Sequence, residues 1–125
     1  MRLLFNIHVK VKGFMSVEQT IRDQIESNNI LLYMKGSPDQ PQCGFSAQTV
    51  QCLMSCGKRF AYVDVLANPE IRSTLPGIAN WPTFPQLWIK GELVGGCDII
   101  TDLYQKGELQ TLVDEADEGA TEQES

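Results

Sequence analysis

Residues 81–98, WPTFPQLWIKGELVGGCD, join a proline-rich loop to two short apolar runs and the start of a helix. The runs Leu87-Trp88-Ile89 and Leu93-Val94-Gly95 flank Lys90-Gly91, which is the pattern of a β-hairpin with a glycine turn. Gly96-Cys97-Asp98 leads from the second run into a helical apolar pattern. The segment therefore predicts an antiparallel pair of strands followed by a helix.

Upstream of this hairpin, strand-like and helix-like segments alternate. Residues 30–35 and 60–65 are short apolar runs, whereas residues 44–57 and 68–80 have helical spacing of their apolar residues. A helix that joins two neighbouring strands implies a crossover, and hence a parallel pair. A parallel pair on one side and a hairpin on the other predict an α/β fold. We expect a mixed four-stranded sheet with helices on both faces, which is the thioredoxin-like architecture.

The N-terminal end is set apart from this pattern. Apolar and polar residues alternate over residues 7–12, which indicates a short strand. We interpret residues 1–14 as a dispensable extension, with a weak targeting role as the alternative. Met15 is then the natural start of the domain. Ser16, three residues before Gln19, matches a capping box and predicts the start of the first helix.

Acidic residues are concentrated at the C-terminal end. The net charge is −6, and residues 113–125 hold six acidic residues and no basic one. We expect a last short helix from about Glu108 to Val113, and residues 114–125 to form an acidic disordered tail. The folded domain is then residues 15–113. No basic cluster occurs in the chain, so no nucleic-acid partner is expected.

The length of 125 residues suits a single domain. No apolar run approaches the roughly 20 residues needed to span a bilayer, and the N-terminal segment lacks the pattern of a secretory signal. We therefore expect a cytoplasmic protein with no membrane partner. Its four cysteines are expected to be reduced in that compartment.

Cys43 is the main candidate for chemistry. It follows a loop with two prolines and directly precedes the helix of residues 44–57. Unpaired N–H groups and the helix dipole at such a position favour the thiolate, and Lys35 should lie at the same edge of the sheet. A dithiol redox motif would place a second cysteine where Ser46 stands. The alternative is that Cys43 is only a small buried residue.

The other cysteines give weaker signals. Cys52 and Cys56 lie four residues apart on one flank of the same helix, so we expect packing thiols, with an accessory redox role as the alternative. No C-x-x-C pair occurs, and the single histidine, His8, is distant in sequence. A structural zinc site is therefore not expected.

A lone thiolate needs an external partner. Cys43 can exchange with a thiol such as glutathione, or it can donate to a metal centre that other molecules complete. Lys35 and Arg72 can hold the carboxylates of glutathione. Asp98 can hold its ammonium group, and the backbone N–H of Cys97 offers a further donor. The alternatives are that Asp98 is a plain helix cap and that Arg72 is a solvated helix residue.

Four separate motifs stand in order along residues 16–112. They are Lys35-Gly36-Ser37-Pro38, Cys43-Gly44-Phe45-Ser46, Trp81-Pro82-Thr83-Phe84-Pro85-Gln86-Leu87 and Gly95-Gly96-Cys97-Asp98. Together they resemble a monothiol glutaredoxin of the CGFS class, and the match is closest to the single-domain bacterial type.

The resemblance implies a homodimer around a [2Fe–2S] cluster, in which Cys43 of each copy ligates one iron and a bound glutathione completes that iron's thiolate pair. It further implies that Lys35 and Arg72 contact the glycyl carboxylate of glutathione. Backbone groups of Phe84, next to a cis-proline at Pro85, would pair with the glutathione main chain. The γ-glutamyl end would be held at the two remaining positions, Cys97 and Asp98.

The resemblance also implies transfer of clusters to apo iron–sulfur proteins and partnership with BolA-like proteins. The loop of residues 36–42 resembles an insertion that disfavours catalytic thiol exchange. A second hypothesis remains an enzyme, a glutathione-dependent oxidoreductase that uses Cys43 by a monothiol route. A third is a thioredoxin-fold interaction module with a regulatory thiol.

Overall fold

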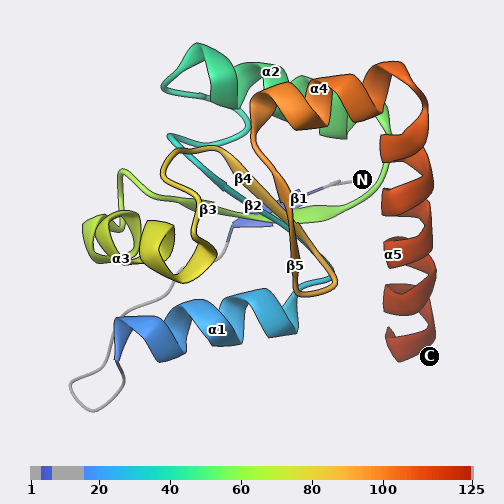
Figure 1. Cartoon of the computed structure of the whole chain (residues 1–125). Helices are drawn as coiled ribbons and strands as arrows, with labels where there is room; N and C mark the ends of the chain where they lie inside the picture. Colours follow the sequence, from blue (N-terminus) through green and yellow to red (C-terminus); the bar gives the residue numbers. More distant parts are fainter. Residues whose placement is uncertain (1–3, 7–15, 125) are drawn as a thin grey trace.

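The structure is a computed structural model, and it describes residues 4–6 and 16–124. A five-stranded sheet has the order β1-β3-β2-β4-β5 (Figure 1). Its strands are β1 Leu4–Asn6, β2 Ile30–Met34, β3 Phe60–Asp64, β4 Gln86–Ile89 and β5 Glu92–Gly95. The helices are α1 Val17–Ser27, α2 Gly44–Ser55, α3 Pro69–Ala79, α4 Cys97–Gln105 and α5 Glu108–Glu124.

The predicted mixed sheet is confirmed. Strand β2 pairs in parallel with β3 and antiparallel with β4, and β4 pairs antiparallel with β5. The hairpin turn has positive φ at Lys90 (52°) and Gly91 (81°), as a tight two-residue β-turn requires. These four strands and their helices form the thioredoxin-like fold.

One further strand was not predicted. Strand β1 pairs in parallel with the outer edge of β3, with Leu4 opposite Phe60 and Asn6 opposite Tyr62. The strand expected over residues 7–12 lies outside the described residues. Three residues are too few for a periodic signal, so only the pairing with β3 identifies β1.

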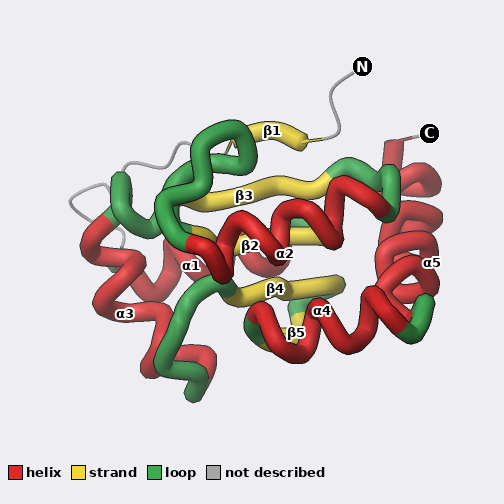
Figure 2. Tube along the Cα trace, turned by 90° about the horizontal axis from the view of Figure 1, so that it is seen from above, coloured by secondary structure: helices red, strands yellow, loops and turns green. Residues whose placement is uncertain are grey.

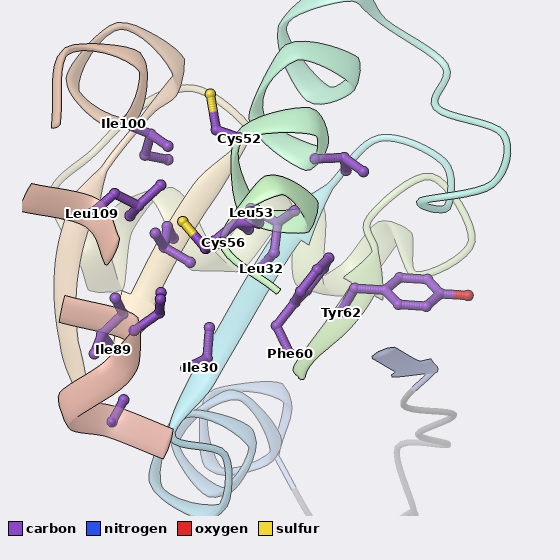
Figure 3. Close-up of a cluster of buried hydrophobic side chains, with 14 of the residues drawn as sticks. Ile30, Leu32, Cys52, Leu53, Cys56, Phe60, Tyr62, Ile89, Ile100 and Leu109 are labelled. Carbon is purple, nitrogen blue, oxygen red and sulfur yellow. The ribbon is translucent and has the colours of Figure 1, made fainter. Parts of the chain in front are cut away.

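Helices cover both faces of the sheet, as Figure 2 shows from above. On one face, α1 and α3 pack against alternate residues of β2 and β3 through Ile21, Ile25, Ile71 and Leu75. On the other face, α2, α4 and α5 enclose the second cluster, which is drawn in Figure 3. Because side chains alternate across a strand, each central strand supplies apolar residues to both clusters.

Two helix starts differ in how they are capped. Ser16 is the N-cap of α1, and its hydroxyl accepts from the Gln19 N–H at 3.0 Å, as predicted. Asn68 occupies the N-cap position of α3 but makes no side-chain cap. Its Nδ2 instead donates to the Asp64 carbonyl at 2.9 Å. Pro76 lies inside α3, which continues past it to Ala79.

The prediction that the last helix ends near Val113 is wrong, because α5 continues to Glu124. Leu109, Val113 and Ala116 are buried at helical spacing against the sheet. Lys58 lies 3.4 Å from an oxygen of Asp114 and 3.5 Å from one of Asp117. The tail expected to be disordered from residue 114 therefore begins as part of a packed helix. The small side chain of Ala116 gave too weak an apolar signal to predict it.

Candidate functional site

A cavity of about 630 Å³ lies where β2, α3 and α4 meet the loop that precedes β4. All five residues predicted to hold glutathione line it: Lys35, Arg72, Phe84, Cys97 and Asp98. They come from four separate segments of the chain, and the structure brings them together. Their roles toward a ligand remain predictions.

Cys43 stands beside this cavity as the N-cap of α2. Its sulfur accepts a hydrogen bond from the Ser46 N–H at 3.4 Å, and its thiol donates to the Ser46 hydroxyl oxygen, also at 3.4 Å. The thiol side chain is partly exposed. Cys43 is therefore a helix-capping residue whose sulfur is reachable from outside, and it is not a core residue.

Ser46 is fully buried, and its hydroxyl has a second contact. The Lys35 N–H, just after strand β2, donates to Ser46 Oγ at 3.1 Å. One hydroxyl thus links the end of the central strand to the sulfur of Cys43. The sequence interpretation treated Ser46 only as the site of a missing cysteine. Its position three residues after the N-cap was the available signal, because the N–H there bonds to a cap side chain.

The electrostatics favour the thiolate of Cys43. Burial alone would raise the pKa of this thiol, but hydrogen bonds from Ser46 and from the Phe45 N–H act in the opposite direction. The charge of Lys35 adds to them. The net effect lowers the pKa of Cys43 below its ordinary value, as predicted, so more of the nucleophilic and metal-binding form is present at neutral pH.

The loop before Cys43 is tied down by its own hydrogen bonds. The Gln42 N–H donates to the Lys35 carbonyl at 2.8 Å, and the Gly36 N–H donates to Asp64 at 2.9 Å. Gly36 has φ of +92°, and a Cβ at this position would lie 2.5 Å from the Gln40 carbonyl oxygen. Only glycine fits there without moving the backbone. The loop therefore has a defined place next to the thiol.

Opposite charges flank the cavity. Lys35 follows β2 and is half-buried, whereas Arg72 on α3 is exposed. Asp98 lies in the first turn of α4, whose N-cap is Gly96, so Asp98 is not the capping residue. Two cations and one carboxylate around a hollow suit a small molecule that has both carboxylates and an ammonium group.

Apolar side chains complete the walls, and the sequence interpretation did not assign them a role. Phe45, Trp81 and Ile99 line the cavity, and 62% of Phe45 is exposed. The Phe84–Pro85 peptide bond is cis, as the resemblance implied. Apolar walls with a few placed polar groups are typical of small-molecule sites.

The remaining cysteines differ from Cys43. Cys52 and Cys56 are buried in the cluster of Figure 3, and burial raises the pKa of both thiols. The packing role predicted for them is confirmed. Cys97 is buried at the start of α4, with its sulfur 3.9 Å from Thr101 Oγ1. All four cysteines are free.

No group of three or more histidine, cysteine or acidic side chains that could hold a metal ion exists within residues 4–6 and 16–124. In the same part of the chain, no helix has both the length and the apolar character required to cross a bilayer. One partly exposed thiol at a helix N-terminus, beside a charged cavity on a thioredoxin-like sheet, defines a thiol protein whose site uses one cysteine.

Comparison with known proteins gives the family. The family model described as Glutaredoxin matches residues 30–94. Glutaredoxin 4 of Escherichia coli K12 is 67% identical over 97 residues, which is 78% of this chain and 84% of the relative. The chain belongs to the glutaredoxin family, and Cys43-Gly44-Phe45-Ser46 makes it a monothiol member of the CGFS class.

Solved structures agree with this assignment. Reduced poplar apo GrxS14 has a TM-score of 0.70 and 44% identity, covering 81% of this chain and 93% of that one. A buckwheat glutaredoxin, solved as its complex with glutathione, has a TM-score of 0.70 and covers 80% of this chain and 89% of its own. At 20% identity, the buckwheat protein supports the fold alone.

Proposed function

We propose that this chain binds glutathione in the cavity beside Cys43 and, as two copies, holds a [2Fe–2S] cluster that it stores and passes to apo-proteins. The observation that supports this most is the lone thiol of lowered pKa, next to a cavity lined by Lys35, Arg72 and Asp98. A site with one thiolate and room for an external thiol suits shared ligation better than a local disulfide.

The cavity fits glutathione by size and charge. Its volume of about 630 Å³ falls within the usual range of small-molecule sites. Lys35 and Arg72 would hold the glycyl carboxylate, and the backbone of Phe84 would pair with the peptide. Cys97 and Asp98, at the N-terminal turn of α4, would hold the γ-glutamyl end. A buckwheat glutaredoxin of similar fold was solved in complex with glutathione.

The number of thiolates supports a shared cluster. A [2Fe–2S] cluster is usually held by four thiolates, and of the cysteines at the site only Cys43 is partly exposed, since Cys97 is buried. Two copies with one glutathione each would supply four. The cluster is then the cargo of a homodimer, and the lowered pKa of Cys43 favours the form that binds iron.

Delivery to apo iron–sulfur proteins and partnership with a BolA-like protein are part of this proposal, as is a cytoplasmic location. The two partnerships are what the resemblance to the CGFS class implies, and the location is the expectation drawn from the sequence. The exposed ring of Phe45 at the rim, 62% accessible, lies where a protein that approaches Cys43 would make contact.

The second candidate is a glutathione-dependent oxidoreductase, favoured by the same partly exposed thiolate. Cys43 would attack the glutathionyl sulfur of a mixed disulfide, and the substrate thiolate would leave and take up a proton. A second glutathione would then attack the Cys43–glutathione disulfide, which releases glutathione disulfide and restores Cys43. The loop of residues 36–42 argues against rapid exchange, because it resembles an insertion that disfavours catalytic thiol exchange.

Anaerobic reconstitution with iron, sulfide and glutathione tests the proposal. We expect a coloured protein with the visible spectrum of a [2Fe–2S] cluster and the mass of a dimer. A colourless monomer that rapidly reduces glutathione mixed disulfides would reject the carrier function in favour of the oxidoreductase. A colourless monomer without that activity would favour an interaction module.

A further inference from the structure

Gln86 is the first residue of β4, and its side-chain amide is fully buried. Both its nitrogen and its oxygen make hydrogen bonds. Its Nε2 donates to the carbonyl oxygens of Trp81 at 3.1 Å and Thr83 at 3.3 Å. Its Oε1 accepts from the Trp88 indole N–H at 3.2 Å. A buried amide with two donors and one acceptor satisfied is fixed in one orientation.

The two carbonyls held by Gln86 belong to the loop that forms one wall of the cavity, since Trp81, Thr83 and Phe84 all line it. The loop begins at a second fixed point, where the Trp81 N–H donates to the Pro76 carbonyl at 3.1 Å. Short loops keep their shape only where their backbone groups have partners. Gln86 supplies these partners from beneath the loop.

We propose that Gln86 is a positioning residue for glutathione binding, which sets the Trp81–Pro85 loop so that the Phe84 backbone faces the ligand. This inference rests on the proposed function. Gln86 lines no part of the cavity, so it acts through the loop and does not touch the ligand. A wall that is already ordered avoids the entropy loss of ordering it on binding.

The chemistry of the contacts requires an amide. A glutamate would present oxygen to the two loop carbonyls and repel them, and a methionine would fill the volume without donating. In either case the loop carbonyls lose their inward partners and become free to turn toward water.

A second buried glutamine provides a matched control. Gln24 on α1 is 5% exposed, and its Oε1 accepts from the Tyr33 hydroxyl at 2.8 Å. Gln24 is not among the cavity residues. Gln24→Met therefore removes a buried amide of the same kind from the same face of the sheet and leaves the loop alone.

The experiment compares wild type, Gln86→Met and Gln24→Met as reduced, cluster-free protein. Calorimetry gives the Kd for glutathione, and urea unfolding gives the stability of each variant. We expect Gln86→Met to weaken glutathione binding about tenfold and Gln24→Met to change it by less than about twofold. Both are expected to lose stability, because each leaves a buried group without its partner.

Fluorine NMR supplies a readout that general loss of stability would not move. The chain has two tryptophans, Trp81 in the loop and Trp88 beneath it, so 5-fluorotryptophan labelling gives two signals. In Gln86→Met we expect the Trp81 signal to broaden or split and to respond less to glutathione. In Gln24→Met it should remain as in wild type. Trp88→Phe assigns the signals.

The outcomes separate the two proposals. Glutathione binding by wild type with an unchanged Kd in Gln86→Met overturns the positioning role and leaves the proposed function intact. If glutathione binding weakens equally in Gln86→Met and Gln24→Met, the positioning role is also overturned, because loss of any buried amide then has the same effect. No binding by wild type rejects the proposed function together with this inference. If Gln86→Met does not fold, Gln86→Glu, which has the same shape but presents oxygen to the loop carbonyls, decides, and an unchanged Kd in that variant overturns the role of Gln86.

Discussion

The thiol of Cys43 donates to the hydroxyl oxygen of Ser46 at 3.4 Å, and the hydrogen bond between these two side chains lowers the pKa of Cys43. The same hydroxyl accepts from the Lys35 N–H at 3.1 Å. The residue that occupies the second cysteine position of a dithiol motif therefore stabilises the thiolate of the first. Ser46 does not merely remove a resolving thiol, because it also sets the acidity and the place of the remaining one.

Ser46→Ala is expected to raise the pKa of Cys43, because the thiolate loses its side-chain hydrogen-bond donor. The backbone N–H of residue 46 remains, so the effect is partial. Alkylation of Cys43 by iodoacetamide at neutral pH should slow by about three- to tenfold. Ser55→Ala, at the exposed far end of α2, is the control and should react as wild type does. Equal rates in the two variants would remove Ser46 from the activation of the thiol.

The cysteines should give opposite pH dependences of stability. The pKa of Cys43 is lower in the folded state, so its contribution is present above the unfolded thiol pKa and is lost as the pH falls through the folded value. Burial raises the pKa of Cys52 and Cys56. Their contributions are present below the unfolded pKa and are lost as the pH rises through the folded values.

Urea unfolding from about pH 6 to about pH 10 checks this, because an ordinary thiol titrates near pH 8.5. In wild type, the thiolate of Cys43 should raise the free energy of unfolding as the pH approaches about 8.5, and Cys43→Ser should not show this rise. Above that pH the free energy of unfolding should fall, and Cys52→Ala should make this fall smaller. The same pH profile in both variants would show that the thiols do not differ in this way.

Cys43→Ser is expected to abolish cluster binding, whereas Cys52→Ser should retain it, because only Cys43 is partly exposed beside the cavity. Both substitutions replace sulfur by oxygen on the same helix, so they are matched in size and chemistry. The visible spectrum and the iron content after anaerobic reconstitution give the answer. Equal loss of iron in the two variants would mean that the ligand assignment is wrong.

Lys35→Ala should weaken glutathione binding by about tenfold, the scale of about 1.4 kcal/mol for one charged contact. It should also raise the pKa of Cys43 slightly, since the charge of Lys35 lowers it. Lys90→Ala, in the exposed turn of the β4–β5 hairpin, is the matched control. Calorimetry with glutathione measures the first effect, and the second is measured by alkylation. Binding that is unchanged in Lys35→Ala would exclude this lysine from the site.

Ending the chain after Val113 should cost about 1 to 2 kcal/mol of stability, because it removes the fully buried Ala116. The Asn29 side chain also loses its contact with the Ala116 carbonyl, at 3.2 Å. A chain that ends after Asp117 keeps these contacts and should unfold at nearly the wild-type urea concentration. If both truncations behave as the full chain does, the packed part of α5 contributes nothing to stability.

Local patterns in the sequence were enough to predict most of the elements. The Lys90-Gly91 turn, the Ser16 cap and the position of Cys43 before α2 are properties of a few neighbouring residues, and each was predicted correctly. The mixed sheet followed because crossover and hairpin connections each permit only one strand direction.

The errors occurred where a segment depends on distant partners. The strand β1 exists through its pairing with β3, and α5 extends past Val113 because Ala116 meets the sheet. Neither Leu4–Asn6 nor Ala116 has a strong signal of its own. Such segments acquire their structure from tertiary contacts, which a local pattern does not contain.

The sequence by itself determined that Cys43 is a single, helix-capping thiol and that a thioredoxin-like sheet supports it. Only the tertiary structure decided that Lys35, Arg72 and Asp98 surround one cavity, and that Ser46 and Gln86 order its edges. The reason is physical. Capping and periodicity act within about one helical turn, whereas a binding site needs side chains from separate strands and helices at one point, and packing alone fixes that arrangement.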